Sequence, residues 1–295
     1  MNVPKQLSEW YNRHKEDQLI IGLLDTGKSK KGRVGGIILF AIIMLAIFGP
    51  ILYPYSPFDI NQYDMLSPPS LEHLAGTDQF GRDLLSRILW GARVSLYVGF
   101  LTVIIAALIG ITLGLISGFY RSKVDEFIMR MTDIMLSFPL IFLALMIIAW
   151  LGPSTENLII ALGVFYIPQF TRLTRASVLS ASERDYVQAA RAVGDKSIII
   201  MIREILPNCL APIIVQSTVA FSYAILAEAT LSFLGLGIQP PTPAWGIMIA
   251  DGRPYIEYAP WLAIIPGVAI MLTVLSFNLF GDALRDALDP RLRID

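Results

Sequence analysis

Long apolar runs without a charge recur along the chain. A helix needs roughly 20 mainly apolar residues to cross a hydrocarbon core of about 30 Å. Six segments meet this requirement: 34–52, 95–119, 134–151, a fourth that begins near Leu158, 212–236 and 261–280. Pro168 lies in the fourth segment and is expected to kink it. The pattern predicts an all-α, polytopic membrane protein with six transmembrane helices.

Lys and Arg are distributed very unevenly between the connections. Seven precede the first segment, three lie between the second and third, six lie between the fourth and fifth, and three follow the sixth. The remaining connections hold only four of the 23. Connections rich in Lys and Arg stay in the cytoplasm. Both termini are therefore predicted to be cytoplasmic.

The spans divide the chain into four parts. These are a cytoplasmic segment 1–33, a first anchor with an extracytoplasmic loop at 34–94, a five-helix core at 95–283 and a cytoplasmic tail at 284–295. The first apolar run is longer than the core of a signal peptide, and no small-x-small cleavage site follows it. We expect it to remain as an anchor.

Composition argues against several kinds of chemistry. Cys209 is the only cysteine, which excludes an internal disulfide or a multi-cysteine metal site. His14 and His73 lie far apart, and the spans offer no paired aspartates and no nucleophile with a base. We therefore expect no catalytic residue, no metal site and no cofactor in this chain. The net charge of −1 gives no reason to expect a nucleic-acid partner.

The string Gly22 to Ser29 matches the phosphate-binding pattern GxxxxGK[ST] in full. That pattern needs a strand before it and a helix after it within a sheet. Only 21 residues precede the string, and an apolar anchor begins five residues after it. The match is interpreted as coincidence, in a flexible basic segment beside the membrane.

The connection at 176–208 is long but has a helical composition. Residues 182–194 begin with a candidate N-cap and an acidic first turn, and they end at Gly194, a natural C-terminal stop. A second helical stretch is expected from Lys196 to Leu206, ending at Pro207. Two short helices with small alanines make a compact knob. From the residues alone, the knob either receives another protein or packs on its own bundle.

This connection resembles the EAA loop of the permease subunits of bacterial and archaeal ABC importers, whose usual pattern is EAA-x3-G-x9-I-x-LP. Gln188 stands where Glu is usual, and Glu204 stands where the Ile is expected, with Ile205 one place later. The two alanines, Gly194 and Leu206-Pro207 keep their spacing. Because Gln188 stands where Glu is usual, the resemblance does not extend to a role for the motif's carboxylate.

Three further strings resemble the peptide/nickel branch of these permeases, in the "C" subunit of the pair. They lie at 76–93 (GTDQFGRDLLSRILWGAR), at 231–246 and at 282–291. Within the first, four apolar residues share one helical face, and Asp83 and Arg87 form a candidate i,i+4 pair. This segment is expected either to lie in the membrane interface as an amphipathic helix or to cap the bundle.

The resemblance implies a type I ABC importer permease that forms half of a translocation pathway in a prokaryotic inner membrane. Its partners would be a homologous second permease subunit, two cytoplasmic ATPases that hold ATP and Mg²⁺, and an extracytoplasmic binding protein. The cargo would be di- or oligopeptides, or alternatively nickel, glutathione or oligosaccharides. The residues implied in contact with an ATPase are Asp185, Tyr186, Gln188, Ala189, Ala190, Arg191, Gly194, Ile205, Leu206 and Pro207.

The fifth span is rich in polar residues, which usually face a bundle interior or a water-filled cavity. Ser217, Tyr223 and Glu228 are the candidates to line the pathway, and Ser217 and Glu228 share a helical face. Hydrogen bonding between helices by the same groups is the alternative. Asp133, at the cytoplasmic edge of the third span, is expected in an interfacial ion pair. A secondary transporter is the main rival, but the inverted repeats and broken helices of that class are not evident.

Overall fold

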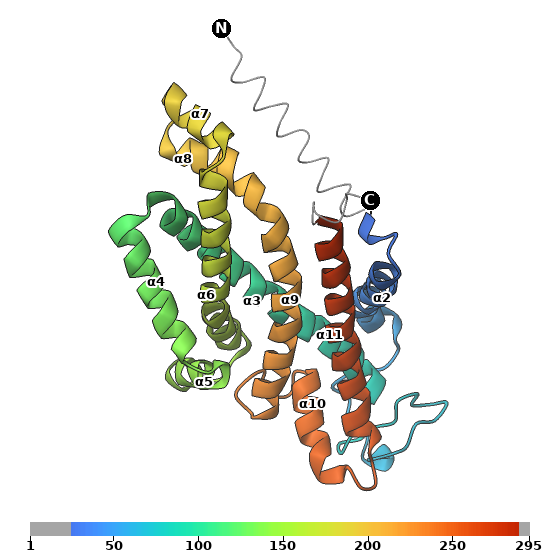
Figure 1. Cartoon of the computed structure of the whole chain (residues 1–295). Coiled ribbons are helices and arrows are strands. Elements are labelled where there is room, and N and C mark those ends of the chain that lie inside the picture. Colours follow the sequence, from blue (N-terminus) through green and yellow to red (C-terminus); the bar gives the residue numbers. More distant parts are fainter. Residues whose placement is uncertain (1–24, 289–295) are drawn as a thin grey trace.

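The computed structural model describes residues 25–288, which fold into a bundle of helices with one isolated β-bridge between Thr77 and Asp83 (Figure 1). The elements in chain order are α2 (Lys30–Leu52), η1 (Gln62–Asp64), α3 (Leu84–Tyr120), α4 (Ser122–Ser137), α5 (Leu140–Leu151), α6 (Thr155–Ser182), α7 (Asp185–Val193), α8 (Ser197–Ile199), η2 (Ile200–Ile205), α9 (Leu206–Phe233), α10 (Trp245–Gly252), η3 (Arg253–Tyr255) and α11 (Trp261–Leu288). The all-α prediction is confirmed for these residues.

Four helices of the described chain are long and apolar enough to cross a membrane: α2, α3, the run from α8 to α9, and α11. The pair α4 and α5 would make a fifth, but the two helices meet at 95°. The third predicted span, 134–151, is therefore wrong as one straight helix. Pro139 disfavours the helical conformation at Phe138, whose ψ of 131° is extended. The count of six stays a prediction.

α3 runs without interruption from Leu84 to Tyr120. The predicted border between loop and core at 94/95 therefore falls inside a helix, and 81–93 does not form a separate interfacial helix. Its polar residues Ser86 and Arg87 are buried, at 1% and 2% exposure, instead of facing water or headgroups. Burial against the outer loop, rather than the amphipathic pattern, decides where this segment lies.

A row of glycines brings α3 against α6. A Cβ added at Gly110, Gly114 or Gly118 would lie within 2.8 Å of side-chain atoms of Phe170, Thr174 or Val178. Small residues at such a seam let two helices approach closely, which membrane helices use for van der Waals packing. The seam makes α3 and α6 the central pair of the bundle.

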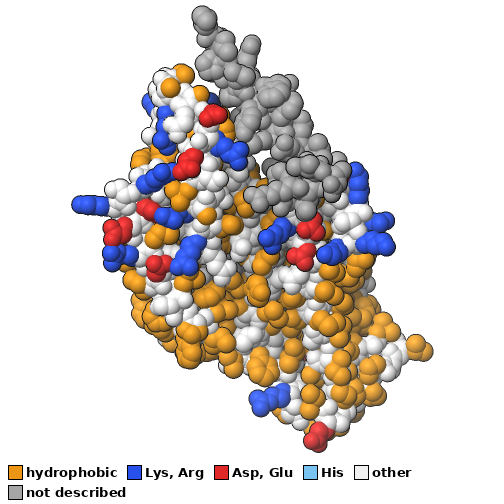
Figure 2. Space-filling model, viewed as in Figure 1, with side chains coloured by type: hydrophobic (Ala, Val, Ile, Leu, Met, Phe, Trp, Pro, Cys, Tyr) orange, Lys and Arg blue, Asp and Glu red, His pale blue; other side chains and the backbone are white. Residues whose placement is uncertain are grey.

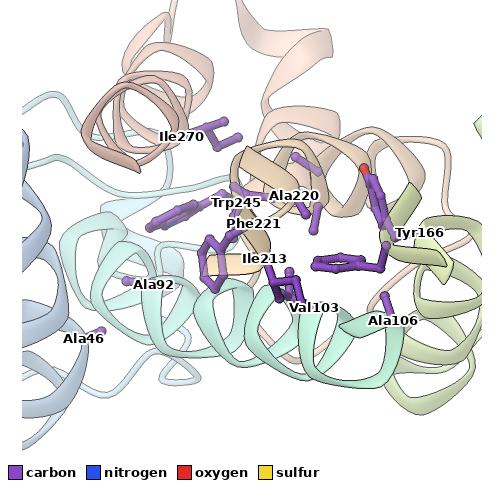
Figure 3. Packing of buried hydrophobic residues seen from close by; sticks show 14 of the residues in the cluster. Ala46, Ala92, Val103, Ala106, Tyr166, Ile213, Ala220, Phe221, Trp245 and Ile270 are labelled. Carbon is purple, nitrogen blue, oxygen red and sulfur yellow. The ribbon is translucent and has the colours of Figure 1, made fainter. Parts of the chain in front are cut away.

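The buried core continues from this seam toward α9. Val103 and Ala106 of α3 lie beside Ile213 and Phe221 of α9, with Tyr166 of α6 next to them (Figure 3). Phe221 stacks on Phe277 of α11, with ring centroids 4.0 Å apart. α9 is thus packed on both sides by other helices of the same chain.

The helix after α7 does not end where the sequence predicted. Pro207 is placed in the first turn of α9, where a missing N–H costs nothing, and the chain continues as a helix to Phe233. A π-helical turn, Ile200–Ile205, joins α8 to α9. α8 is therefore joined to α9 by continuous helix, and residues 194–196 connect α7 to α8.

Basic residues gather at one end of the bundle, beside the start of α2 and the ends of α6 and α11 (Figures 1 and 2). The start of α2 contacts the end of α11, since a Cβ at Gly35 would meet Phe280 at 2.8 Å. The connections predicted to be cytoplasmic thus share one end wherever they are described. Which side of a membrane that end faces remains a prediction.

The phosphate-loop-like string ends in a helix cap. Ser29 accepts a hydrogen bond from Gly32 N at 2.9 Å as the N-cap of α2, and Lys28 pairs with Asp25 at 2.8 Å. Residues 22–24 lie outside the described chain, and residues 25–29 form a turn that leads into α2.

Candidate functional site

α7 is a short helix at the basic end of the bundle, and Gly194 ends it as predicted. Gly194 adopts the left-handed conformation with φ of 87°, and its N–H donates to the carbonyls of Ala190 and Arg191. Asp195 N also donates to Ala190 O at 3.2 Å, which completes the C-terminal cap. Asp185 occupies the first turn, where its negative charge interacts favourably with the positive end of the helix dipole.

The knob is anchored by one buried side chain and two polar contacts. Val187 is fully buried in the same cluster as Ile200 and Ile205. Gln188 donates from Nε2 to Ser182 O at 3.1 Å, and the Arg191 guanidinium lies 5.2 Å from the Phe119 ring centre. These contacts tie α7 to the end of α6, to η2 and to α3.

The outward face of the knob carries exposed small and apolar residues. Asp185, Gln188, Ala189, Arg191 and Gly194 of the predicted set are exposed, and Tyr186 and Ala190 are half-buried. Next to them, three apolar side chains that the sequence analysis did not select are exposed to more than half: Val193 at 65%, Ile198 at 54% and Ile202 at 53%. We call this set of exposed residues, 185–202, the coupling surface.

The predicted trio Ile205, Leu206 and Pro207 lies elsewhere. Ile205 is fully buried, and Leu206 and Pro207 are partly buried at the start of α9. Because a buried side chain cannot contact an ATPase, Ile205 supports the coupling surface from below instead. The sequence pattern identified the trio without showing that it faces inward.

Replacing Gly194 with alanine is expected to loosen the end of α7. A left-handed conformation costs a residue with a Cβ about 1–2 kcal/mol, and no other atom lies within 4 Å of a Cβ there to relieve or add strain. Hydrogen exchange of the α7 amides should accelerate while exchange in α3 is unchanged. Equal acceleration in both helices would contradict a local role for Gly194.

Glu228 is fully buried between α9 and α3. Its carboxylate accepts hydrogen bonds from Ser95 Oγ at 2.9 Å and from Ser232 Oγ at 2.8 Å. Ser232 Oγ in turn accepts from Ile238 N at 3.3 Å in the loop after α9. Glu228 therefore makes hydrogen bonds between helices, which favours the alternative role, and its place in a pathway stays a prediction.

The other two pathway candidates are placed differently. Ser217 is half-buried and donates to Ile213 O at 2.9 Å within its own helix. Tyr223 is 59% exposed, on a stripe of α9 that also holds Leu226 and Thr230. Of the three, only Tyr223 points to an open face of the chain, so its pathway role stays a prediction.

α6 carries a row of polar contacts to its neighbours. Gln216 of α9 donates from Nε2 to Gln169 Oε1 at 3.3 Å. One turn further along α6, Arg172 pairs with Asp133 of α4 at 2.5 Å, and Arg175 pairs with Asp125. The predicted ion pair of Asp133 thus exists, with Arg172 as its partner, while Arg130 pairs with Glu126.

The outer string GTDQFGRDLLSR forms a tight turn before α3. Asp78 accepts from Phe80 N and Arg82 N and pairs with the Arg82 side chain at 2.7 Å. Gly81 has φ of 72°, and a Cβ there would overlap Asn61 O. Asp83 caps α3 by accepting from Ser86 N at 2.7 Å, while Arg87 contacts Asp78 and the Pro57 carbonyl. The predicted Asp83–Arg87 pair is replaced by these contacts.

Comparison with known proteins agrees with this architecture. The family described as binding-protein-dependent transport system inner membrane component matches residues 110–294, and the N-terminal transmembrane domain of oligopeptide transport permease C matches residues 28–69. The dipeptide transport system permease protein DppC of Alkalihalophilus pseudofirmus is 50% identical over 266 residues, covering 90% of this chain and 88% of the relative.

Two further relatives have similar coverage. The di/tripeptide transport system permease protein DppC of Pseudomonas aeruginosa is 48% identical over 270 residues, covering 89% of each chain. The dipeptide transport system permease protein DppC of Escherichia coli is 48% identical over 273 residues, covering 90% of this chain and 91% of the relative. The first family match alone spans more than half of the chain. The chain therefore belongs to the family of binding-protein-dependent transport system inner membrane components, as a multi-pass protein of that membrane.

Proposed function

We propose that this chain is one of two permease subunits of an ATP-driven importer of di- and oligopeptides. A homologous second permease would complete the pathway, and two cytoplasmic ATPases would bind ATP and Mg²⁺. An extracytoplasmic binding protein would deliver the peptide. The names of the relatives support peptide cargo, because all three carry out dipeptide or di/tripeptide transport.

The single observation that carries the coupling role is the exposed, firmly mounted coupling surface. Its small residues, Ala189 and Gly194, allow close approach of another protein, and Val193, Ile198 and Ile202 offer apolar area to bury. Exposed apolar side chains grouped in this way mark protein interfaces.

The mounting explains how movement would reach the membrane. The knob follows directly after α6 and continues through η2 into α9. A displacement of the knob by closing ATPases would move these two helices together as a rigid body. ATP would then act through contact, and no residue of this chain takes part in hydrolysis.

The test is replacement of Ala189 with tryptophan in the reconstituted complex of two permeases and two ATPases, to which the binding protein is added. A large indole on the coupling surface should hold the ATPases away from the knob. We expect peptide uptake and the ATP hydrolysis stimulated by loaded binding protein to fall at least about tenfold, the scale of a disrupted interface centre. Both are measured in proteoliposomes at equal protein content.

Lys123→Trp is the matched control, because Lys123 is exposed near the same end of the bundle but on α4. It should leave both activities close to wild type. Unchanged hydrolysis in Ala189→Trp would contradict coupling through this surface. Uptake of nickel, glutathione or an oligosaccharide instead of a labelled dipeptide by the wild-type complex would contradict the cargo and leave the coupling role intact.

A further inference from the structure

α6 is too polar for its position. It has 28 residues, about 42 Å at 1.5 Å per residue, and it packs against α3, α4, α5 and α9. Despite this length it is absent from the helices of the described chain that are apolar enough to span a membrane. The polar residues Gln169, Arg172 and Arg175 lie in the second half of α6, toward the basic end of the bundle, and polar residues in such a helix usually face the bundle interior or a water-filled cavity.

Two of these polar residues are not fully buried between the helices. Gln169 is half-buried, and Arg172 is exposed at 52% of its side chain. Their partners come from the flanking helices, Gln216 from α9 and Asp133 from α4, and Asp133 is exposed at 61%. The amide pair and the ion pair thus lie three residues apart on α6 and involve three helices, and we call these four residues the α4–α6–α9 cluster.

The cluster has unused hydrogen-bonding capacity. Each glutamine side chain offers a carbonyl oxygen and two N–H donors, and among the described residues the one bond between them is the only one that either side chain makes. Arg172 and Asp133 balance each other's charge while more than half of each remains exposed. The cluster is therefore neutral as a whole, and a ligand can reach it.

We propose that the α4–α6–α9 cluster is a transient binding site for peptides with free termini. The peptide carboxylate would pair with Arg172, and the ammonium would pair with Asp133. The peptide amide would form hydrogen bonds with Gln169 and Gln216. This inference rests on the proposed peptide-import function and names the residues that contact the cargo.

The dimensions and charges suit such a ligand. A dipeptide spans about 7 Å, and residues 169 and 172 are separated by about 4.5 Å along the helix axis. The peptide carboxylate replaces Asp133 as the partner of Arg172, and the peptide ammonium replaces Arg172 as the partner of Asp133. No charge is therefore left unpaired during the exchange. Because the groups stay hydrated, the peptide is held weakly and can leave.

The test compares Arg172→Gln and Asp133→Asn with the control variants Arg130→Gln and Glu126→Gln. The control pair is also an exposed ion pair, on α4 alone, with a distance of 2.5 Å. We expect dipeptide uptake by the reconstituted complex to fall about tenfold in the cluster variants, the effect of losing one charge-assisted hydrogen bond. Hydrolysis stimulated by loaded binding protein should persist, so that fewer peptides enter per ATP.

A double variant, Arg172→Asp with Asp133→Arg, separates recognition from structure. If the pair merely joined α4 to α6, exchanging the charges would restore uptake, and that result would overturn the proposal. Cluster variants that behave like the controls would also overturn it, while leaving wild-type peptide import intact. Absence of peptide uptake by the wild-type complex would instead refute the proposed function.

A labelling experiment serves as a second measurement in case the charge variants fold poorly. Cys209, the only cysteine of the chain, is buried, so a thiol introduced by Gln169→Cys can be followed alone on this subunit. Its labelling should slow when loaded rather than empty binding protein is added with ATP. Ser180→Cys, exposed on the same helix about three turns away, should not respond. Equal labelling of Gln169→Cys in both conditions would contradict the proposal.

Discussion

Replacing Gly114 with alanine is expected to destabilise the protein by forcing α3 away from α6. The new Cβ would lie 2.6 Å from Thr174 Cβ and 2.7 Å from Thr171 O. One of these atoms belongs to the backbone of α6, so a rotamer change cannot make room. α3 and α6 must separate, at a cost of about 1–3 kcal/mol for overpacking.

The measurement is the thermal unfolding of the detergent-solubilised complex, followed by the loss of its monodisperse peak. Gly267→Ala is the matched control, because Gly267 lies inside α11 and no atom would come within 4 Å of its Cβ. There alanine should be neutral or stabilising by up to about 1 kcal/mol through helix propensity. Both variants replace glycine with alanine, so the opposite signs of their expected stability changes follow from the close packing of α3 on α6. A Gly114→Ala protein as stable as Gly267→Ala would refute close packing of α3 on α6.

The second large effect is expected at Glu228. Alanine removes the acceptor for the buried hydroxyls of Ser95 and Ser232 and leaves a void between α3 and α9. The combined loss should be about 2–4 kcal/mol in stability. Glutamine keeps one carbonyl oxygen as an acceptor and adds an N–H₂ that a rotated hydroxyl can accept, so Glu228→Gln should cost less than about 1 kcal/mol.

Uptake measured beside stability distinguishes the structural role from a pathway role. Glu228→Gln is expected to retain most peptide uptake, because the hydrogen bonds between helices persist. Glu257→Ala is the control, since Glu257 is exposed in the loop between η3 and α11. If Glu228→Gln kept its stability but lost uptake, the carboxylate charge itself would act in transport, and the interpretation drawn from its burial would be wrong.

Periodicity and composition predicted the helices well where each one is apolar along its whole length. The runs 34–52 and 261–280 correspond to α2 and α11 within a few residues at most ends. The same pattern was less informative at 134–151, where the apolar run continues through Phe138 and Pro139 while the backbone turns by 95°. A hydrophobic run indicates that a segment lies in apolar surroundings, but it does not show where the backbone changes direction.

The candidate site was predicted in part for a related reason. The end of α7 at Gly194 follows from local chemistry, because a left-handed cap is a property of glycine. The inward placement of Ile205, the exposure of Val193 and Ile198, and the burial of Glu228 depend on which helices pack beside them. The polarity of α6 was visible as Gln169, Arg172 and Arg175 in the sequence, yet their partners on α4 and α9 were not.

The sequence by itself determined that this is a helical membrane protein, which of its connections share a side, and which family it resembles. These properties depend on local composition: apolar length, the positions of Lys and Arg, and short strings with fixed spacing. The tertiary structure alone decided that Glu228 joins α3 to α9 and that Ile205 supports the coupling surface from within. It also decided that an ion pair joins α4 to α6 and that an amide pair joins α6 to α9. The physical reason is that each of these contacts joins residues far apart in the chain, and only the packing of one helix on another brings them within hydrogen-bonding distance.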